Sequence, residues 1–145
     1  MIISQMTEDD IPEAMIINRS ATSHTLSYNE YKSAIKSGYL AYTIKYHNAD
    51  EISGYIIAKY QGCDCYINDF GVAAEDRKKG IGKTLLNFLF SEAKKRRCPR
   101  VYLHVRAANS PAVKLYKSLG FKMSSIKPKF YKGKEDAFYL VKELS

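Results

Sequence analysis

The sequence lacks several features of secreted, membrane and zinc-binding chains. Its three cysteines, Cys63, Cys65 and Cys98, are an odd number without a Cys-x-x-Cys pair. This argues against a disulfide framework and a zinc site, so we expect no metal and expect the thiols to pack as small apolar side chains in a reducing compartment. No apolar run approaches the ~20 residues that span a membrane, and no basic segment precedes an apolar core near residue 1. We therefore expect a cytoplasmic protein.

Acidic residues are also scarce: 15 Asp and Glu against 23 Lys and Arg give a net charge of +8. Part of this excess suits a polyanionic cofactor. The run Lys94–Arg97 could contact nucleic acid or a ribosome, or simply complement a helix C-terminus and face water. Because no aromatic-rich RNA-binding signature accompanies the charge, we do not expect specific nucleic-acid binding. Repeats, low-complexity tracts and linkers are absent, and the length of 145 residues indicates one domain, residues 1–145.

The most informative stretch combines a strand, a glycine-rich basic loop and a helix. Tyr66–Val72 is typical of an extended segment, Arg77–Lys83 is basic with Gly80 and Gly82, and Thr84–Arg97 has the periodicity of an amphipathic helix. The first N–H groups of a helix have no intrahelical acceptor and carry partial positive charge. Glycines let a phosphate approach the backbone. The stretch therefore predicts a phosphate site.

Spacing distinguishes this loop from two other phosphate binders. A Walker loop requires glycine at Arg77, five positions before Gly82, and a dinucleotide fingerprint requires glycine at Leu85. Both patterns fail, and an ordinary strand-to-helix turn with solvated lysines is the other structural interpretation. Arg-x-x-Gly-x-Gly after a strand instead resembles the coenzyme A pyrophosphate loop of the GCN5-related N-acetyltransferases, the GNAT family.

The remaining periodicity alternates strands and helices. The strand Val101–Val105 should pair in parallel with Cys63–Val72 through a right-handed crossover. We expect an exposed loop over residues 127–134. The other expected strands are Met1–Met6, Tyr39–Tyr46, Ile52–Tyr60, Phe121–Ile126 and Glu135–Val141, and the other helices are Thr7–Arg19, Tyr28–Ser37 and Asn109–Leu119.

Two later segments make the family resemblance specific. Leu103–Phe121 resembles the last block of the GNAT family, and Phe130–Ala137 resembles the C-terminal block of its N-terminal (Nα) protein acetyltransferase branch. The likeness is dense over Tyr66–Leu144 and thinner before it, where it depends mainly on Leu26–Asn29. It implies an α/β (α+β) GNAT fold: a mixed, mostly antiparallel sheet of about seven strands, splayed between the fourth and fifth, with about four helices.

The resemblance implies acetyl transfer from acetyl-CoA to a primary amine in a ternary complex, without an acyl-enzyme. It assigns the base to Tyr66 and His104 holding a water, although bacterial members of the branch carry Glu at the position of His104. Outside this context, a strand Tyr and His are more often packed residues. The resemblance makes Tyr116 the general acid for the coenzyme thiolate and places Asn109 on the pantetheine arm. The expected coenzyme-binding residues are Phe70, Gly71, Val72, Arg77, Lys78, Lys79, Gly80, Ile81, Gly82, Lys83, Thr84, Asn109 and Tyr116.

The acceptor is expected to be a protein or peptide N-terminus. An α-amine has a pKa near 7.7–8.0, which suits a His base, whereas a lysine amine near 10.4 favours a stronger base such as a carboxylate. Lysine or polyamine acetylation is the alternative, and a non-catalytic coenzyme A sensor or ribosome-binding module is a third hypothesis. A ribosome or an auxiliary subunit is a further partner left open. The expected acceptor-binding residues are Leu26, Tyr28, Asn68, Phe130 and Tyr131.

Overall fold

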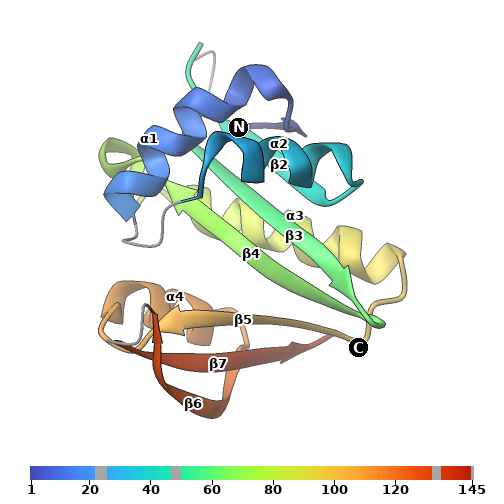
Figure 1. Ribbon diagram of the computed structural model, residues 1–145, viewed down its shortest axis with the longest axis vertical. Coiled ribbons are helices and arrows are strands. Elements are labelled where there is room, and N and C mark those ends of the chain that lie inside the picture. The colour runs from blue at the N-terminus through green and yellow to red at the C-terminus, as the bar shows by residue number, and fades with distance from the viewer. Residues whose placement is uncertain (22–25, 47–49, 132–134, 145) are drawn as a thin grey trace. The chain divides into compact units, whose positions relative to one another are not determined.

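A computed structural model describes residues 1–21, 26–46, 50–131 and 135–144 (Figure 1). These residues form seven strands, hydrogen-bonded in the order β1-β2-β3-β4-β5-β7-β6, and four α-helices. The strands are β1 (Ile2–Gln5), β2 (Leu40–Lys45), β3 (Gly54–Gln61), β4 (Asp64–Val72), β5 (Arg100–Arg106), β6 (Lys122–Tyr131) and β7 (Glu135–Glu143). The helices are α1 (Ile11–Ala21), α2 (Tyr28–Lys36), α3 (Ile81–Lys95) and α4 (Ser110–Ser118), with short 3-10 turns at Glu8–Asp10 and Ala74–Asp76.

The chain divides into two compact units. Unit 1 comprises Met1–Lys59 and Asn68–Leu89, and unit 2 comprises Tyr60–Ile67 and Phe90–Ser145. The parallel pairing of β4 with β5 (Cys65↔Val101, Tyr66↔Tyr102) lies within unit 2. The predicted mixed sheet of seven strands with four helices is confirmed for the described residues. The single domain and the splay between β4 and β5 stay predictions.

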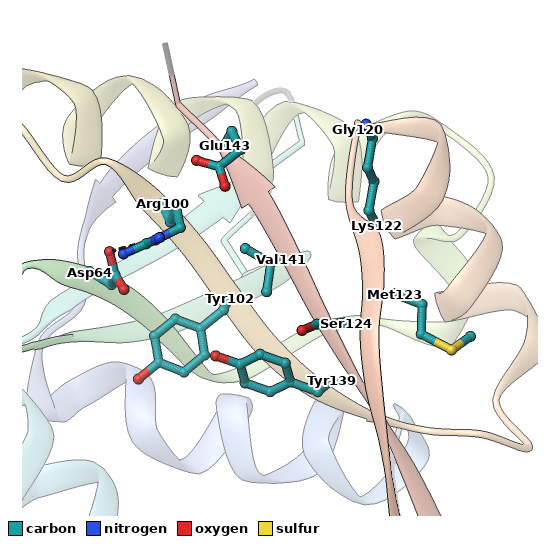
Figure 2. Close-up of a pocket in the computed structure, with 10 residues that line it drawn as sticks. All are labelled: Asp64, Arg100, Tyr102, Gly120, Lys122, Met123, Ser124, Tyr139, Val141 and Glu143. Carbon is teal, nitrogen blue, oxygen red and sulfur yellow. Dashed lines mark hydrogen bonds and ion pairs between the residues drawn. The ribbon is translucent and has the colours of Figure 1, made fainter.

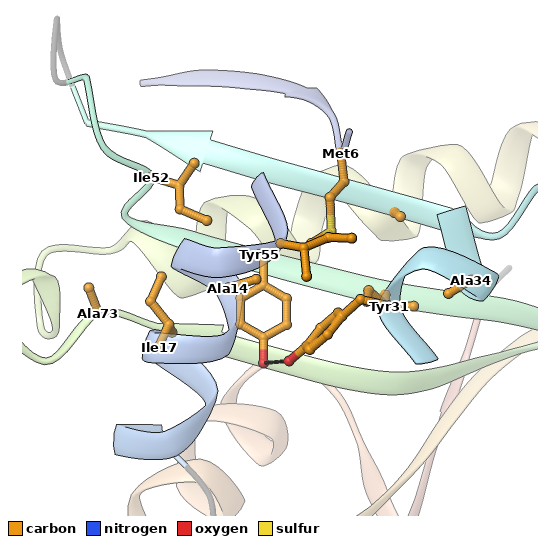
Figure 3. Close-up of a cluster of buried hydrophobic side chains, with 11 residues drawn as sticks. Met6, Ala14, Ile17, Tyr31, Ala34, Ile52, Tyr55 and Ala73 are labelled. Carbon is orange, nitrogen blue, oxygen red and sulfur yellow. Dashed lines mark hydrogen bonds between the residues drawn. The ribbon is translucent and has the colours of Figure 1, made fainter. Parts of the chain in front are cut away.

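In unit 1, strands β2 and β3 are covered on both faces. Ala41 and Tyr55 belong to a buried cluster that also contains residues of α1 and α2 (Figure 3). On the other face, the ring of Tyr42 contacts that of Phe88 of α3 at 4.9 Å. Side chains alternate across a strand, so the consecutive residues Ala41 and Tyr42 face opposite layers. That double burial explains why the first five residues of β2, Leu, Ala, Tyr, Thr and Ile, are all buried and show no clear alternation.

Unit 2 has one buried and one open sheet face. On β5, Val101 and Leu103 are buried, whereas Tyr102 and His104 on the opposite face are half-buried. Strand β7 pairs antiparallel with β5, and β6 pairs antiparallel with β7 at the edge of the sheet. This alternation leaves a row of ring side chains on the open face.

Three sequence predictions need correction. Helix α3 begins at Ile81 rather than Thr84, because Gly80 with φ 81° already turns the chain into the helix. Residues 127–131 belong to β6 rather than to a loop, because register shifts between Lys127 and Tyr131 let the strand pass Pro128 without losing its pairing to β7. Cys65 and Cys98 are buried as expected, but Cys63 is exposed in the turn between β3 and β4.

Across the ranges that the structure describes, no helix combines the length and the apolar character needed to cross a membrane.

Candidate functional site

The start of α3 presents unpaired backbone donors to its loop. Thr84 donates its N–H to the Gly80 carbonyl at 3.0 Å and its hydroxyl to the same oxygen at 2.8 Å. The N–H groups of Ile81, Gly82 and Lys83 precede that bond in the chain and therefore have no acceptor within the helix. Together with the helix dipole, they give the start of α3 in unit 1 the partial positive charge that favours an anion.

The basic side chains of this loop differ in what they bind. Arg77 donates to the carbonyl oxygens of Val72 and Ser20, both at 3.2 Å, and so connects the end of β4 to α1. Lys79 pairs with Asp76 at 3.3 Å. Lys78 and Lys83 are both exposed. Among the four basic residues predicted for the coenzyme site, Arg77 therefore also holds the loop in place through hydrogen bonds, a role that was not predicted from the sequence.

In unit 2, Tyr66 of β4 and His104 of β5 contact each other directly. The Tyr66 hydroxyl lies 3.1 Å from Nδ1 of His104. Burial, and secondarily the charge of Lys127, lower the pKa of His104 below 6.5. Burial also raises the pKa of Tyr66, assisted by Tyr102 and Tyr139. At neutral pH the pair is thus a neutral imidazole beside a protonated phenol, which can pass one proton along a single hydrogen bond.

Phe130 of β6 covers the imidazole. The two rings are stacked, with centroids 4.5 Å apart and an interplanar angle of 16°. Phe130 itself remains 47% exposed. Part of the ring is therefore accessible to solvent, while the stacked face contributes to the burial of His104.

The row of rings continues along the same sheet face. Tyr102 contacts Tyr66 at 4.9 Å and Tyr139 at 5.4 Å, and Tyr139 also contacts His104 at 5.1 Å. Tyr102 and Tyr139 line a groove of about 620 Å³ that also holds the ion pair of Arg100 with Asp64 (Figure 2). Neither tyrosine was predicted from the sequence as a site residue. The two-residue period of β5 could have placed Tyr102 beside His104, but Tyr139 depends on the register of β7.

Helix α4 positions the remaining residues predicted for the coenzyme. Asn109 caps the helix, because its Oδ1 accepts from the Ala112 N–H at 3.3 Å. Tyr116 is buried, and its ring packs edge-on against Phe121 at 5.5 Å. The helix thus fixes the orientation of the Tyr116 ring through core packing.

The predicted acceptor residues are distributed over both units. In unit 1, Leu26 packs against the buried cluster, while Tyr28, the first residue of α2, is 42% exposed. The helix starts there because Ser27 and Glu30 form a capping box. Asn68 of β4 is also exposed. Tyr131 in unit 2 ends β6, and its side chain, like residues 132–134, lies outside the described residues.

Comparison with known proteins identifies the family. Residues 5–121 match the model of the Acetyltransferase (GNAT) family. The chain belongs to the GNAT family. This acetyltransferase is 27% identical to the [ribosomal protein bS18]-alanine N-acetyltransferase of Escherichia coli K12, over 99% of this chain and 97% of the relative. It is 28% identical to an N-alpha-acetyltransferase of Sulfurisphaera tokodaii, over 93% and 88% of the two chains. The crystal structure of the ribosomal-protein-S18-alanine N-acetyltransferase from Escherichia coli superposes with a TM-score of 0.88, covering 99% of this chain and 94% of that one.

Within each unit, the GNAT chain brings some of the predicted residues together. In unit 2, Tyr66, His104 and Phe130 form one contiguous group. In unit 1, Arg77 donates to the carbonyl oxygen of Val72. The N–H of Phe70, predicted to contact the thioester, donates to the Asp69 carboxylate at 2.9 Å. Asp69 is a further residue that was not predicted from the sequence.

Replacing Phe130 by alanine should raise the pKa of His104 toward 6.5. The alanine removes the ring that covers one face of the imidazole, and burial is the main cause of the lowered pKa. Titration of the His104 ring protons by NMR measures the change. Lys129→Ala, an exposed neighbour on the same strand, is the control that should leave the pKa in place. An unchanged pKa in the Phe130→Ala variant would show that the stacking does not bury His104.

Proposed function

We propose that this GNAT protein transfers the acetyl group of acetyl-CoA to the α-amine of protein or peptide N-termini in the cytoplasm. The observation that carries the proposal is the hydrogen-bonded pair of Tyr66 and His104, whose imidazole is neutral at physiological pH. An imidazole is a weak base. It suits an α-amine, with a pKa near 7.7–8.0, better than a lysine amine, with a pKa near 10.4. At pH 7, deprotonating the lysine amine costs roughly 3–4 kcal/mol more than deprotonating the α-amine.

In the proposed reaction, one proton enters the Tyr66–His104 pair. The incoming ammonium gives a proton to the Tyr66 oxygen, directly or through a water, while the Tyr66 hydroxyl proton moves to Nδ1 of His104. The free amine then attacks the thioester carbonyl carbon, so a C–N bond forms and the C–S bond breaks. The thiolate departs with a proton from the hydroxyl of Tyr116, and the second amine proton passes through solvent water to the Tyr116 phenolate, which restores its hydroxyl. The products are the acetylated N-terminus and coenzyme A.

The coenzyme is proposed to bind through the start of α3. Its diphosphate would accept from the N–H groups of Ile81, Gly82 and Lys83, with the exposed Lys78 and Lys83 supplying charge. The other predicted members of this site, Lys79, Gly80 and Thr84, shape the loop. Phe70, Gly71 and Val72 would receive the thioester, and Asn109 the pantetheine arm. The Phe70 N–H is already held by Asp69, so the thioester oxygen would accept from the N–H groups that follow it in this segment.

The acceptor is proposed to meet exposed aromatic side chains. Tyr28 and Phe130 are each more than two-fifths exposed, although each belongs to a regular element, so the ring of each is accessible to an acceptor peptide. Leu26, Asn68 and Tyr131 complete the proposed acceptor site. The named substrate of the Escherichia coli relative is a ribosomal protein, which supports a protein acceptor here. A ribosome or an auxiliary subunit is the further partner that this function leaves open.

A panel of short peptides tests this function. Each peptide carries a different first residue and an internal lysine, and a matched copy has a blocked N-terminus. We expect acetyl-CoA turnover with the free N-termini and none with the blocked copies. Turnover of blocked peptides or of polyamines would instead assign the protein to lysine or small-amine acetylation, and acetyl-CoA binding without any turnover would indicate a sensor.

A further inference from the structure

A buried carboxylate connects four elements of unit 1. Asp69 of β4 is 8% exposed. Its Oδ2 accepts from the hydroxyls of Tyr55 (β3) at 2.6 Å and Tyr31 (α2) at 2.9 Å. The amide of Asn18 (α1) donates to both oxygens at 3.1 and 3.2 Å, and the Phe70 N–H donates to Oδ1 at 2.9 Å. Figure 3 shows how Tyr31 and Tyr55 converge from α2 and β3.

All four hydrogen-bond neighbours of Asp69 are donors, as they would be around an ionised carboxylate. Burial and the charge of Asp69 raise the pKa values of Tyr55 and Tyr31, which keeps both hydroxyls protonated. Phenylalanine could fill the volume of either ring without a polar group. A charged centre with two tyrosines is therefore more than this core needs for packing.

The cluster also leaves a polar atom unpaired. Oδ1 of Asn18 is buried and, among the described residues, has no hydrogen-bond partner. Burying an unpaired acceptor is unfavourable, and natural sequences depart from this rule mainly at functional sites. The orientation of the Asn18 amide is set by Asp69, since only its nitrogen can donate to the carboxylate.

The position of Asp69 gives this arrangement a consequence for both substrates. On one side it holds the backbone N–H of Phe70, the first residue of the segment Phe70–Val72 that is proposed to receive the thioester. On the other side it holds Tyr31, which lies one turn after Tyr28 on α2. Movement of the carboxylate would therefore change the backbone on the coenzyme side and the helix on the acceptor side together.

We propose that Asp69 is a positioning residue, which fixes the Phe70–Val72 backbone for the thioester and ties it to the helix that carries Tyr28. This inference rests on the proposed acetyltransferase function. It predicts that perturbing Asp69 weakens the binding of a coenzyme that carries the thioester carbonyl and leaves the binding of a coenzyme that lacks it unaffected.

Calorimetric titration of the Asp69→Asn variant with acetyl-CoA and with coenzyme A tests this. We expect acetyl-CoA to bind about tenfold more weakly, the equivalent of one hydrogen bond, while coenzyme A binds as in the wild type. Asp9→Asn, at an exposed aspartate of the same unit, should change neither affinity. A purely structural role would lower the melting temperature and weaken both ligands equally, and that result, like two unchanged affinities, would overturn the inference.

The acceptor side has its own variant. Tyr31→Phe removes the bond from α2 and keeps that between Asp69 and Phe70, so it should raise the peptide KM several-fold without changing the ratio of the two coenzyme affinities. If Asp69→Asn does not fold, Asn18→Ser removes another donor from the same carboxylate and takes its place in the titration. The coenzyme titrations need no acceptor. A wild-type protein that acetylates no N-terminus would refute the proposed function and leave this measurement intact.

Discussion

Replacing His104 by alanine should lower kcat/KM for a free N-terminal peptide by about 10²–10⁴-fold at pH 7, the usual contribution of a general base. The variant loses the nitrogen that lies 3.1 Å from the Tyr66 hydroxyl, so no proton can move from the phenol to the imidazole. Initial rates with acetyl-CoA measure the loss. The affinity for acetyl-CoA should be retained, because the proposed diphosphate donors belong to α3.

The size of this defect should depend on pH. Above about pH 8 most α-amines are already neutral, so the base becomes less important and the variant should approach the wild type. The wild-type rate should fall at a pH below 6.5, where His104 takes up a proton, because burial lowers the pKa of His104. A defect of constant size from pH 6 to pH 9.5 would contradict the base role.

The same titration predicts a change in stability. Because burial lowers the pKa of His104 in the folded protein, the unfolded chain binds the proton first as the pH falls below 6.5. The free energy of unfolding should therefore decrease below that pH and continue to decrease until the folded state is protonated as well. His104→Gln keeps a planar polar side chain over Phe130 but cannot titrate. Denaturant melts of this variant should therefore lack the decrease in the free energy of unfolding that His104 causes.

The sequence predicted most elements of the fold because their signals are local. Gly80 and Gly82 after a strand marked the start of α3 to within three residues, and Asn109 followed by Pro111 marked α4. The strand after Phe121 was predicted too short, because Pro128 is a strand breaker in most contexts. The register shifts in β6 that accommodate it depend on β7 and are not visible in the sequence.

The candidate site could be predicted only where the order of the strands itself brings two residues together. Tyr66 and His104 were paired correctly, since two neighbouring parallel strands bring them together. Asp69 was missed because its partners Asn18, Tyr31 and Tyr55 are 14 to 51 positions away, and an aspartate in a strand is equally typical of an exposed position. Long-range polar contacts of this kind leave no periodic signal.

Replacing Lys83 by glutamate should weaken acetyl-CoA binding about 100-fold and yet stabilise the fold. Lys83 is exposed in the first turn of α3, so the change disturbs no core packing. It removes a charge-assisted hydrogen bond worth about 1.5–3 kcal/mol and places an anion beside the diphosphate. In the same position, a carboxylate interacts favourably with the helix dipole by about 0.3–1 kcal/mol. The acetyl-CoA affinity measured by calorimetry should thus fall, while the melting temperature should rise.

Lys94→Glu, at the other end of the same helix, is the matched control. It makes the same charge change at an exposed site, but there it opposes the helix dipole, so it should lower stability and leave coenzyme affinity near that of the wild type. A short acetyl thioester without a diphosphate separates binding from chemistry. The Lys83→Glu variant should use it as well as the wild type does, because the lost interaction involves only the diphosphate. Equal losses with acetyl-CoA and with the short thioester would place the diphosphate elsewhere, and the start of α3 would then be an ordinary helix terminus.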